Sequence, residues 1–115
     1  MSSTHEFGLI DHIDSQKNFD RYSPEKYNCI SIDGDIVESL YENLLAMETY
    51  FHSLDRPEFG LAYYGVTLIP PNSLPFFFNV VTSSRDFENS ERLNELAIKI
   101  QQAIKEKKHM IHYGI

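Results

Sequence analysis

The side chains best suited to chemistry in this sequence are one cysteine and a few histidines. Cys29 beside a histidine could act as a thiolate nucleophile, because an adjacent imidazole lowers the pKa of a thiol. Its spacing to His52, His109 and His112 matches no signature of cysteine hydrolases, so a buried strand cysteine is favoured. In a strand, His109 and His112 would point to opposite faces, and no neighbouring cysteine or carboxylate completes a ligand shell. The sequence predicts neither a metal site nor a cofactor.

Paired carboxylates are the second group with chemical potential. Asp33 and Asp35 flank a glycine as in a calcium loop, but the further ligands and the closing glutamate are missing, so helix capping is favoured. Glu38 and Glu42 lie one helical turn apart and could be a general acid and base, yet a solvated or docking face is the ordinary interpretation. The sequence holds neither a glycine-rich phosphate loop nor a nucleophile elbow. We therefore predict that the chain is not an enzyme.

Charge narrows the class of partner. The net charge is −7, and residues 1–60 carry twelve acids against four bases. Such a field repels nucleic acid and anionic lipid, whereas it speeds encounter with a basic protein. No apolar run approaches the roughly 20 residues that span a bilayer, a single cysteine forms no intrachain disulfide, and no secretory signal is evident. These features predict a cytoplasmic protein that binds neither membranes nor nucleic acid directly.

The elements that would position these groups follow from hydrophobic spacing. With 115 residues and 42% hydrophobic content, we expect one domain over residues 1–115, frayed at 1–5. Residues 6–25 read as loop, with a short strand or helical turn near 9–13. The further elements expected are a strand over 27–32, a long helix over 35–51, and a strand over 59–69 with a bulge or a close approach of another backbone at its glycines. They continue with a short helix that an N-cap at Ser73 opens and that ends near 83, a long helix from 89 or 90 to 107, and a terminal strand over 110–115.

These elements predict an α+β fold. A small sheet of about three to four strands would pack against two long helices and one short helix. In that arrangement the acids of the first long helix lie on its solvent face.

Three segments resemble a known family. They are KYNCISIDGD at 26–35, RPEFGLAYYGVTLIPP at 56–71 and MIHYGI at 110–115, and they are similar to small bacterial immunity proteins encoded beside secreted polymorphic toxins. The resemblance implies a cytosolic inhibitor that binds the effector domain of a toxin through surface contacts. It assigns no individual functional residue.

We therefore predict an acidic protein-binding module, most concretely an immunity or antitoxin-like protein with a basic partner. The expected contact residues are Asp33, Asp35, Glu38, Tyr41, Glu42 and Asp55. One alternative is a small enzyme or ligand-binding domain whose pocket lies under the strand 59–69, with Tyr63, Tyr64, His52 and His112 as its polar groups. Another is a homodimeric structural protein paired through a sheet edge such as the terminal strand.

Overall fold

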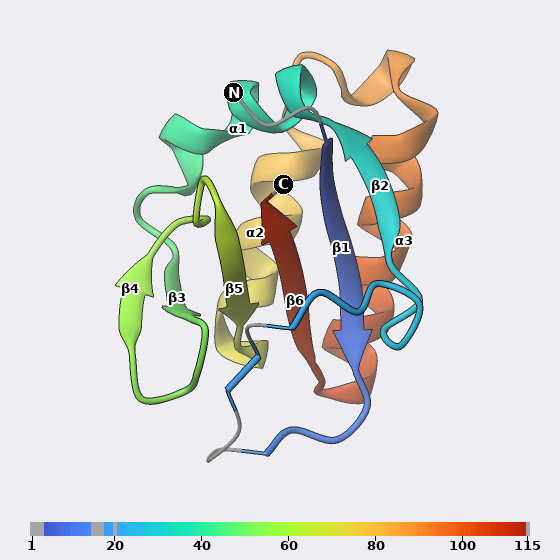
Figure 1. Cartoon of the computed structure of the whole chain (residues 1–115). Helices are drawn as coiled ribbons and strands as arrows, with labels where there is room; N and C mark the ends of the chain where they lie inside the picture. Colours follow the sequence, from blue (N-terminus) through green and yellow to red (C-terminus); the bar gives the residue numbers. More distant parts are fainter. Residues whose placement is uncertain (1–3, 15–17, 20, 115) are drawn as a thin grey trace.

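The computed structural model describes residues 4–14, 18, 19 and 21–114, which form a single compact α+β domain. Over this part of the chain, six antiparallel strands make one sheet in the order β2-β1-β6-β5-β3-β4 (Figure 1). The strands are β1 (Thr4–Ile10), β2 (Ile30–Asp33), β3 (Glu48–Phe51), β4 (Pro57–Phe59), β5 (Gly65–Ile69) and β6 (His109–Gly114). The α+β class is confirmed, whereas the prediction of three to four strands is wrong.

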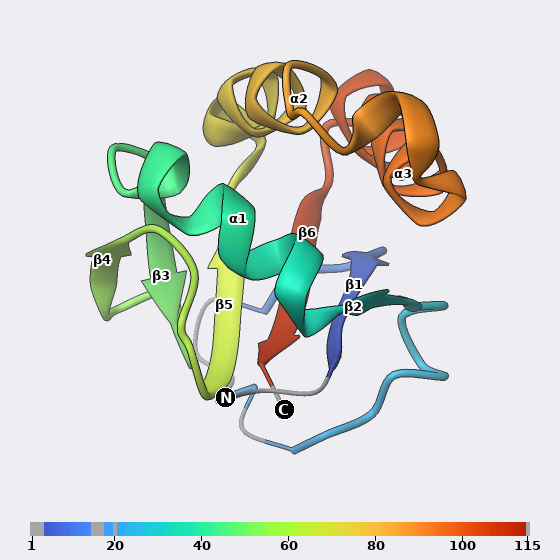
Figure 2. The same cartoon turned by 90° about the horizontal axis from the view of Figure 1, so that it is seen from above.

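Helices cover only one face of this sheet. They are α1 (Gly34–Leu44), α2 (Leu74–Thr82) and α3 (Glu91–Glu106). Figure 2 shows all of them on the same side, with the connection between β1 and β2 on the other side. The two faces of the sheet are therefore covered by different kinds of structure.

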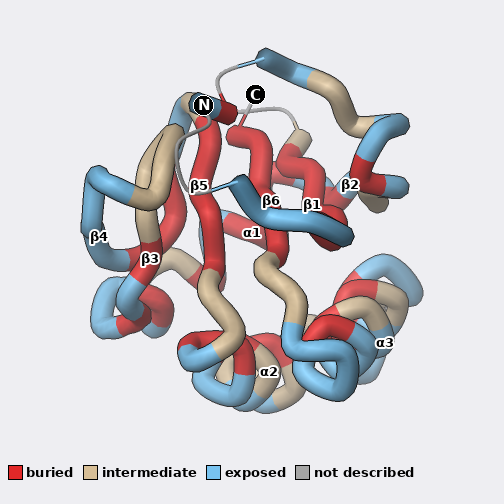
Figure 3. The backbone as a smooth tube through the Cα atoms, turned by 90° about the horizontal axis from the view of Figure 1, so that it is seen from below, coloured by how far each residue is buried: buried red, intermediate tan, exposed pale blue. Residues whose placement is uncertain are grey.

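The larger core lies between the sheet and the helices. Alternate side chains of the central strands, such as Phe7 of β1 and Met110 of β6, meet Leu40, Phe77 and Leu96 of the helices, and all of these are almost fully buried. In Figure 3 the buried stretches run along β1, β6 and β5 and along the inner sides of the helices. The alternation follows from the two-residue period of a strand.

A smaller core lies on the opposite face. Val66, Leu68, Ile111 and Tyr113 point away from the helices and pack with Phe19 of the β1–β2 connection. Phe19 is only 3% exposed although it belongs to no helix or strand. The connection therefore supplies the hydrophobic cover that helices supply on the other face.

The first long helix is shorter than predicted. It ends at Leu44, and Glu48–Phe51 forms β3 instead of two further helical turns. Met47 and Phe51 keep the helical spacing, but β3 pairs with both β4 and β5, and its residues after Glu48 are strong strand formers. Tertiary pairing thus overrides a local helical pattern.

The predicted strand over 59–69 is two strands separated by a loop. Gly60 and Gly65 have φ angles of +73° and +116°, which non-glycine residues rarely adopt, and they bound the break between β4 and β5. The predicted bulge is therefore a complete interruption. It places Tyr63 and Tyr64 in a connection at the surface.

The strands at the two ends of the chain are more central than expected. β1 was expected as loop with a short strand or helical turn near 9–13, but over 4–10 it is paired on both sides and buried on both faces. The frayed start expected over 1–5 is wrong for residues 4 and 5, and residues 1–3 lie outside the described part of the chain. A strand buried on both faces lacks the alternation that sequence patterns detect. The predicted terminal strand is confirmed up to Gly114 as β6, between β1 and β5, and residue 115 lies outside the described part of the chain. β2 begins at Ile30 and not at Tyr27.

The last two helices agree with the prediction. Ser90 caps α3, since its side chain accepts a hydrogen bond from the Leu93 amide at 3.1 Å. The predicted side-chain cap at Ser73 is wrong, because its hydroxyl donates to the carbonyl oxygen of Glu48 at 2.6 Å and makes no cap hydrogen bond to α2. Its polar group ties α2 to β3 instead.

Candidate partner-binding surface

The acids predicted at the site lie at the start and along the outer face of α1. Asp33 is the N-cap, and its carboxylate accepts a hydrogen bond from the Asp35 amide at 2.8 Å, as predicted. Asp35, Glu38 and Glu42 are all exposed. The helix repeat places Glu38 and Glu42 one turn apart, so α1 presents a continuous row of carboxylates to solvent.

A row of tyrosines stands beside these acids. Tyr41 of α1 is half-buried and stacks on Tyr63, with ring centroids 5.4 Å apart. Tyr63 in turn meets Tyr64 edge-on at 4.9 Å, and the Tyr64 side chain is 61% exposed. Aromatic rings packed in this way lose little freedom on binding, which suits them to anchor a partner.

The carboxylates of α1 influence the pKa values of the neighbouring tyrosines. Desolvation raises the pKa of Tyr63. The nearby Glu38 carboxylate adds to this shift, followed by Tyr64 and Asp35. Desolvation raises the pKa of Tyr41 to about 12, and Tyr63 and Glu38 add to the shift. Both phenols therefore stay neutral at physiological pH and remain hydrogen-bond donors amid negative charge. We call Asp33, Asp35, Glu38, Glu42, Tyr41, Tyr63 and Tyr64 the acidic-tyrosine surface.

One predicted contact residue lies elsewhere. Asp55 is exposed in the turn between β3 and β4, where it accepts a hydrogen bond from the Ser53 hydroxyl. β3 lies four strand positions from β2, which ends at Asp33. At about 4.8 Å per strand, this separation is about 19 Å. This separation applies to Asp33 alone, because β3 also pairs with β5, which begins directly after Tyr64, so the role of Asp55 as a contact residue stays a prediction.

Beneath Tyr41 lies a buried pair of histidines. Nδ1 of His5 is 2.7 Å from Nε2 of His112, and Nδ1 of His112 is 3.1 Å from the Thr67 hydroxyl. That hydroxyl accepts a hydrogen bond from the Ala62 amide at 2.8 Å. Burial lowers the pKa of His5, and it lowers the pKa of His112 well below the usual value with a further contribution from His5. Both rings are therefore neutral at pH 7, and they hold β1, β6 and β5 together through polar contacts.

The other candidate chemistry finds little support in the geometry. Burial first, and then the Glu6 carboxylate, raise the pKa of Cys29 to about 12, so its thiol stays protonated at neutral pH. Cys29 is partly buried, but it lies between the turn at 24–28 and β2 and not in the strand that was expected. Within the described ranges, no group of three or more His, Cys, Asp or Glu side chains could hold a metal ion.

The polar groups of the alternative pocket are spread over different environments. His112 is fully buried in the helix-side core region, whereas Tyr64 is largely exposed. They therefore do not share one cavity wall. Sequence reasoning named Tyr63 and Tyr64 for this pocket, and it also expected one or two of the four tyrosines Tyr41, Tyr50, Tyr63 and Tyr64 beside the acids without identifying which. The available signal was a tyrosine pair between two glycines in a segment without charge.

The homodimer through the terminal strand is also excluded, because β6 is central and the sheet edges are β2 and β4. Homodimerisation by another route stays a prediction. In the part of the chain that is described, none of the helices has the length and apolar character needed to span a membrane. Comparisons with protein-family models, curated proteins and solved structures gave no significant match.

Proposed function

We propose that this chain is a protein-binding module that neutralises a basic protein by direct contact through the acidic-tyrosine surface. The most concrete partner is the effector domain of a toxin, the class that the resemblance of the three sequence segments implies. The observation that carries the proposal is the juxtaposition of exposed carboxylates on α1 with the ladder Tyr41–Tyr63–Tyr64.

The chemistry of this surface selects cationic side chains. Lysine and arginine form charge-assisted hydrogen bonds with carboxylates and also bind to tyrosine ring faces. Tyr64 offers an accessible ring, and Glu38 lies close enough to influence Tyr63. The surrounding negative charge would steer a basic partner into place, an effect that salt screens.

A partner capture experiment tests the proposal. The tagged chain, with and without Glu38→Lys/Glu42→Lys, is used to isolate partners from native cytosol and from cells expressing neighbouring genes, at low and high salt. We expect a stoichiometric basic protein that the wild type retains at low salt and loses at high salt. The captured protein would then be assayed for toxicity with and without the chain.

The matched control is Glu58→Lys/Glu91→Lys, which makes the same charge change at exposed positions on β4 and α3. We expect this control to keep the affinity for the partner within severalfold, whereas the α1 variant loses most of it. Tyr64→Ala, which removes an exposed ring without a charge change, should weaken binding by about tenfold or more if it is an anchor. Equal affinities for the wild type and the α1 variant would refute this placement of the site.

A further inference from the structure

A cavity lies on the face of the sheet opposite the helices, in the connection between β1 and β2. Residues 11–29 link the two strands without a helix or strand of their own among the described residues. Connections of this length inside a compact domain are uncommon and usually have a function. Here the connection encloses a cavity of about 550 Å³, which falls within the range of small-molecule sites.

The walls of this cavity are fastened to the sheet. The Phe19 amide donates to the carbonyl oxygen of His52 at 2.7 Å, and the Tyr22 hydroxyl donates to the Glu6 carboxylate. Further along, the Leu9 amide donates to the carbonyl oxygen of Tyr27 at 3.2 Å. A preformed cavity of this kind binds a ligand without a large cost in ordering.

Close contact between the connection and the backbone of β1 also indicates a preformed cavity. The connection runs directly over Gly8 of β1, where an added Cβ would lie 2.5 Å from the carbonyl oxygen of Tyr27. Only glycine permits this approach. The cavity wall is therefore built into the sequence of the central strand as well as into the connection.

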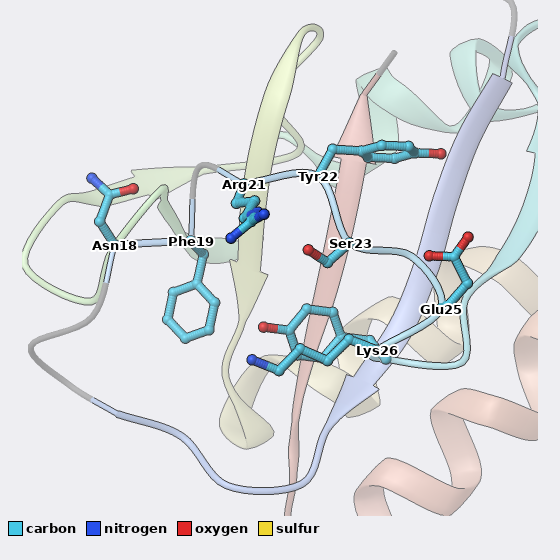
Figure 4. A pocket seen from close by; sticks show the side chains of 8 residues that line it. Asn18, Phe19, Arg21, Tyr22, Ser23, Glu25 and Lys26 are labelled. Carbon is cyan, nitrogen blue, oxygen red and sulfur yellow. The ribbon is translucent and has the colours of Figure 1, made fainter.

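The lining of the cavity carries two bases and one acid, whereas the chain as a whole is acidic. Three of the four bases in residues 1–60 lie between positions 17 and 26. Two of them, Arg21 and Lys26, line the cavity together with the Ser23 hydroxyl. In Figure 4 these three side chains lie on the same side as Phe19, whereas Glu25 extends away from them. Two bases against one acid in the lining, within a chain of net charge −7, indicate a local preference for anions.

We propose that this cavity binds a small anionic ligand that carries a flat ring, with aryl phosphates as the chemical class. The Arg21 guanidinium can hold two phosphate oxygens as a planar fork, and the Lys26 ammonium adds a point charge. The ring would contact Phe19 and Tyr27, the aromatic side chains of the lining other than Tyr22, because Tyr22 extends away from Arg21 and Lys26 (Figure 4). A bare phosphate would leave most of the volume unfilled. This site is separate from the acidic-tyrosine surface, so each can fail without the other.

Titration by two-dimensional NMR with three probes tests the inference. The probes are phenyl phosphate, inorganic phosphate and phenol, each added to the isotope-labelled full chain. We expect phenyl phosphate to shift the amide signals of residues 18–27, with an affinity at least about tenfold above that of either fragment. Shifts confined to other parts of the chain would overturn the site. Equal affinities for phenyl phosphate and inorganic phosphate would overturn the requirement for a ring.

Two double variants distinguish phenyl phosphate binding in the cavity from non-specific attraction to positive charge. Arg21→Gln/Lys26→Gln should weaken phenyl phosphate binding by about tenfold or more, while Arg56→Gln/Lys105→Gln, which removes the same charge at exposed positions outside the cavity, should change it less than about twofold. All four side chains are exposed, and an unchanged amide spectrum verifies the fold. If both double variants weaken binding equally, the cavity is not the site. Partner capture should be unaffected by Arg21→Gln/Lys26→Gln.

Discussion

The two faces of the sheet are stabilised in different ways. On one face, three helices bury a continuous set of aliphatic and aromatic side chains. On the other, an irregular connection contributes a few hydrophobic side chains and several polar anchors, including the contact between Tyr22 and Glu6. Helices satisfy their own backbone hydrogen bonds, whereas an irregular segment needs specific partners for each group. We call the side of the sheet covered by α1, α2 and α3 the helix face and the side covered by the β1–β2 connection the loop face. We therefore expect the helix face to determine global stability and the loop face to open locally.

The largest expected effect comes from truncating one buried phenylalanine on each face. Phe77 of α2 is fully buried and packs on Phe7, with ring centroids 5.8 Å apart. Phe77→Ala should lower the free energy of unfolding by about 3–5 kcal/mol, because rigid helices cannot close the cavity. Phe19→Ala should cost less, on the order of 1–3 kcal/mol, since the connection can relax around the gap. Urea unfolding of both variants measures the difference, and equal losses would contradict the comparison.

Sequence patterns captured the helix face better than the loop face. The spacing of Leu93, Leu96 and Ile100 predicted α3, and all three are fully buried. An amphipathic helix carries its burial pattern in a single stretch of sequence. The end of α1 was missed, because the pairing of β3 with β4 and β5 decided it.

The structure of the loop face and of the candidate site could not be fully predicted from the sequence, because both depend on contacts between segments far apart in the chain. Phe19 is buried by strands that lie about 50 and 90 residues further along the chain, and no local period indicates this. The acids of α1 were predictable, because consecutive helical turns fix their common face. The position of Tyr63 beside Tyr41 was not, because it depends on the break between β4 and β5.

Acidification should lower the free energy of unfolding through the buried histidines of the helix face. Burial lowers the folded-state pKa values of His5 and His112 below the ordinary value of 6.5, so the unfolded chain takes up protons first as the pH falls. The free energy of unfolding should be constant above about pH 7 and fall below about pH 6.5, by up to about 1.4 kcal/mol per pH unit for each buried histidine. Burial also lowers the pKa of His109, which adds to the slope.

Chemical denaturation between about pH 5 and pH 8 measures this profile. His5→Gln should give a shallower slope, because one of the groups that protonates on unfolding is gone. A profile without slope in the wild type would show that the pair accepts protons in the folded state, and the assignment of two neutral rings would be wrong.

A single polar anchor on the loop face should have a smaller and more local effect. Tyr22→Phe removes the donor to the Glu6 carboxylate, which keeps a hydrogen bond from the Ser31 hydroxyl at 3.2 Å. We expect a loss of about 1 kcal/mol in global stability, because water can replace the lost donor. Amide exchange should accelerate more in residues 21–29 than in α3. Tyr64→Phe at an exposed position serves as the control, and uniform acceleration throughout the chain would contradict local opening.

The smallest expected effect concerns the ion pairs that join the two regions. Nζ of Lys108 lies 2.7 Å from Oδ1 of Asp11, at the start of the connection, and 2.7 Å from Oε1 of Glu106, at the end of α3. Hydrogen bonds from Lys108 lower the pKa values of both carboxyl groups. The carboxylates are exposed, so solvent screens most of this attraction. Lys108→Met should therefore lower the Tm less than Tyr22→Phe does, and the difference from the wild type should vanish near 1 M salt. A larger loss that persists at high salt would mean that this bridge couples the connection to the helix layer, and the two faces could not be treated as separate units.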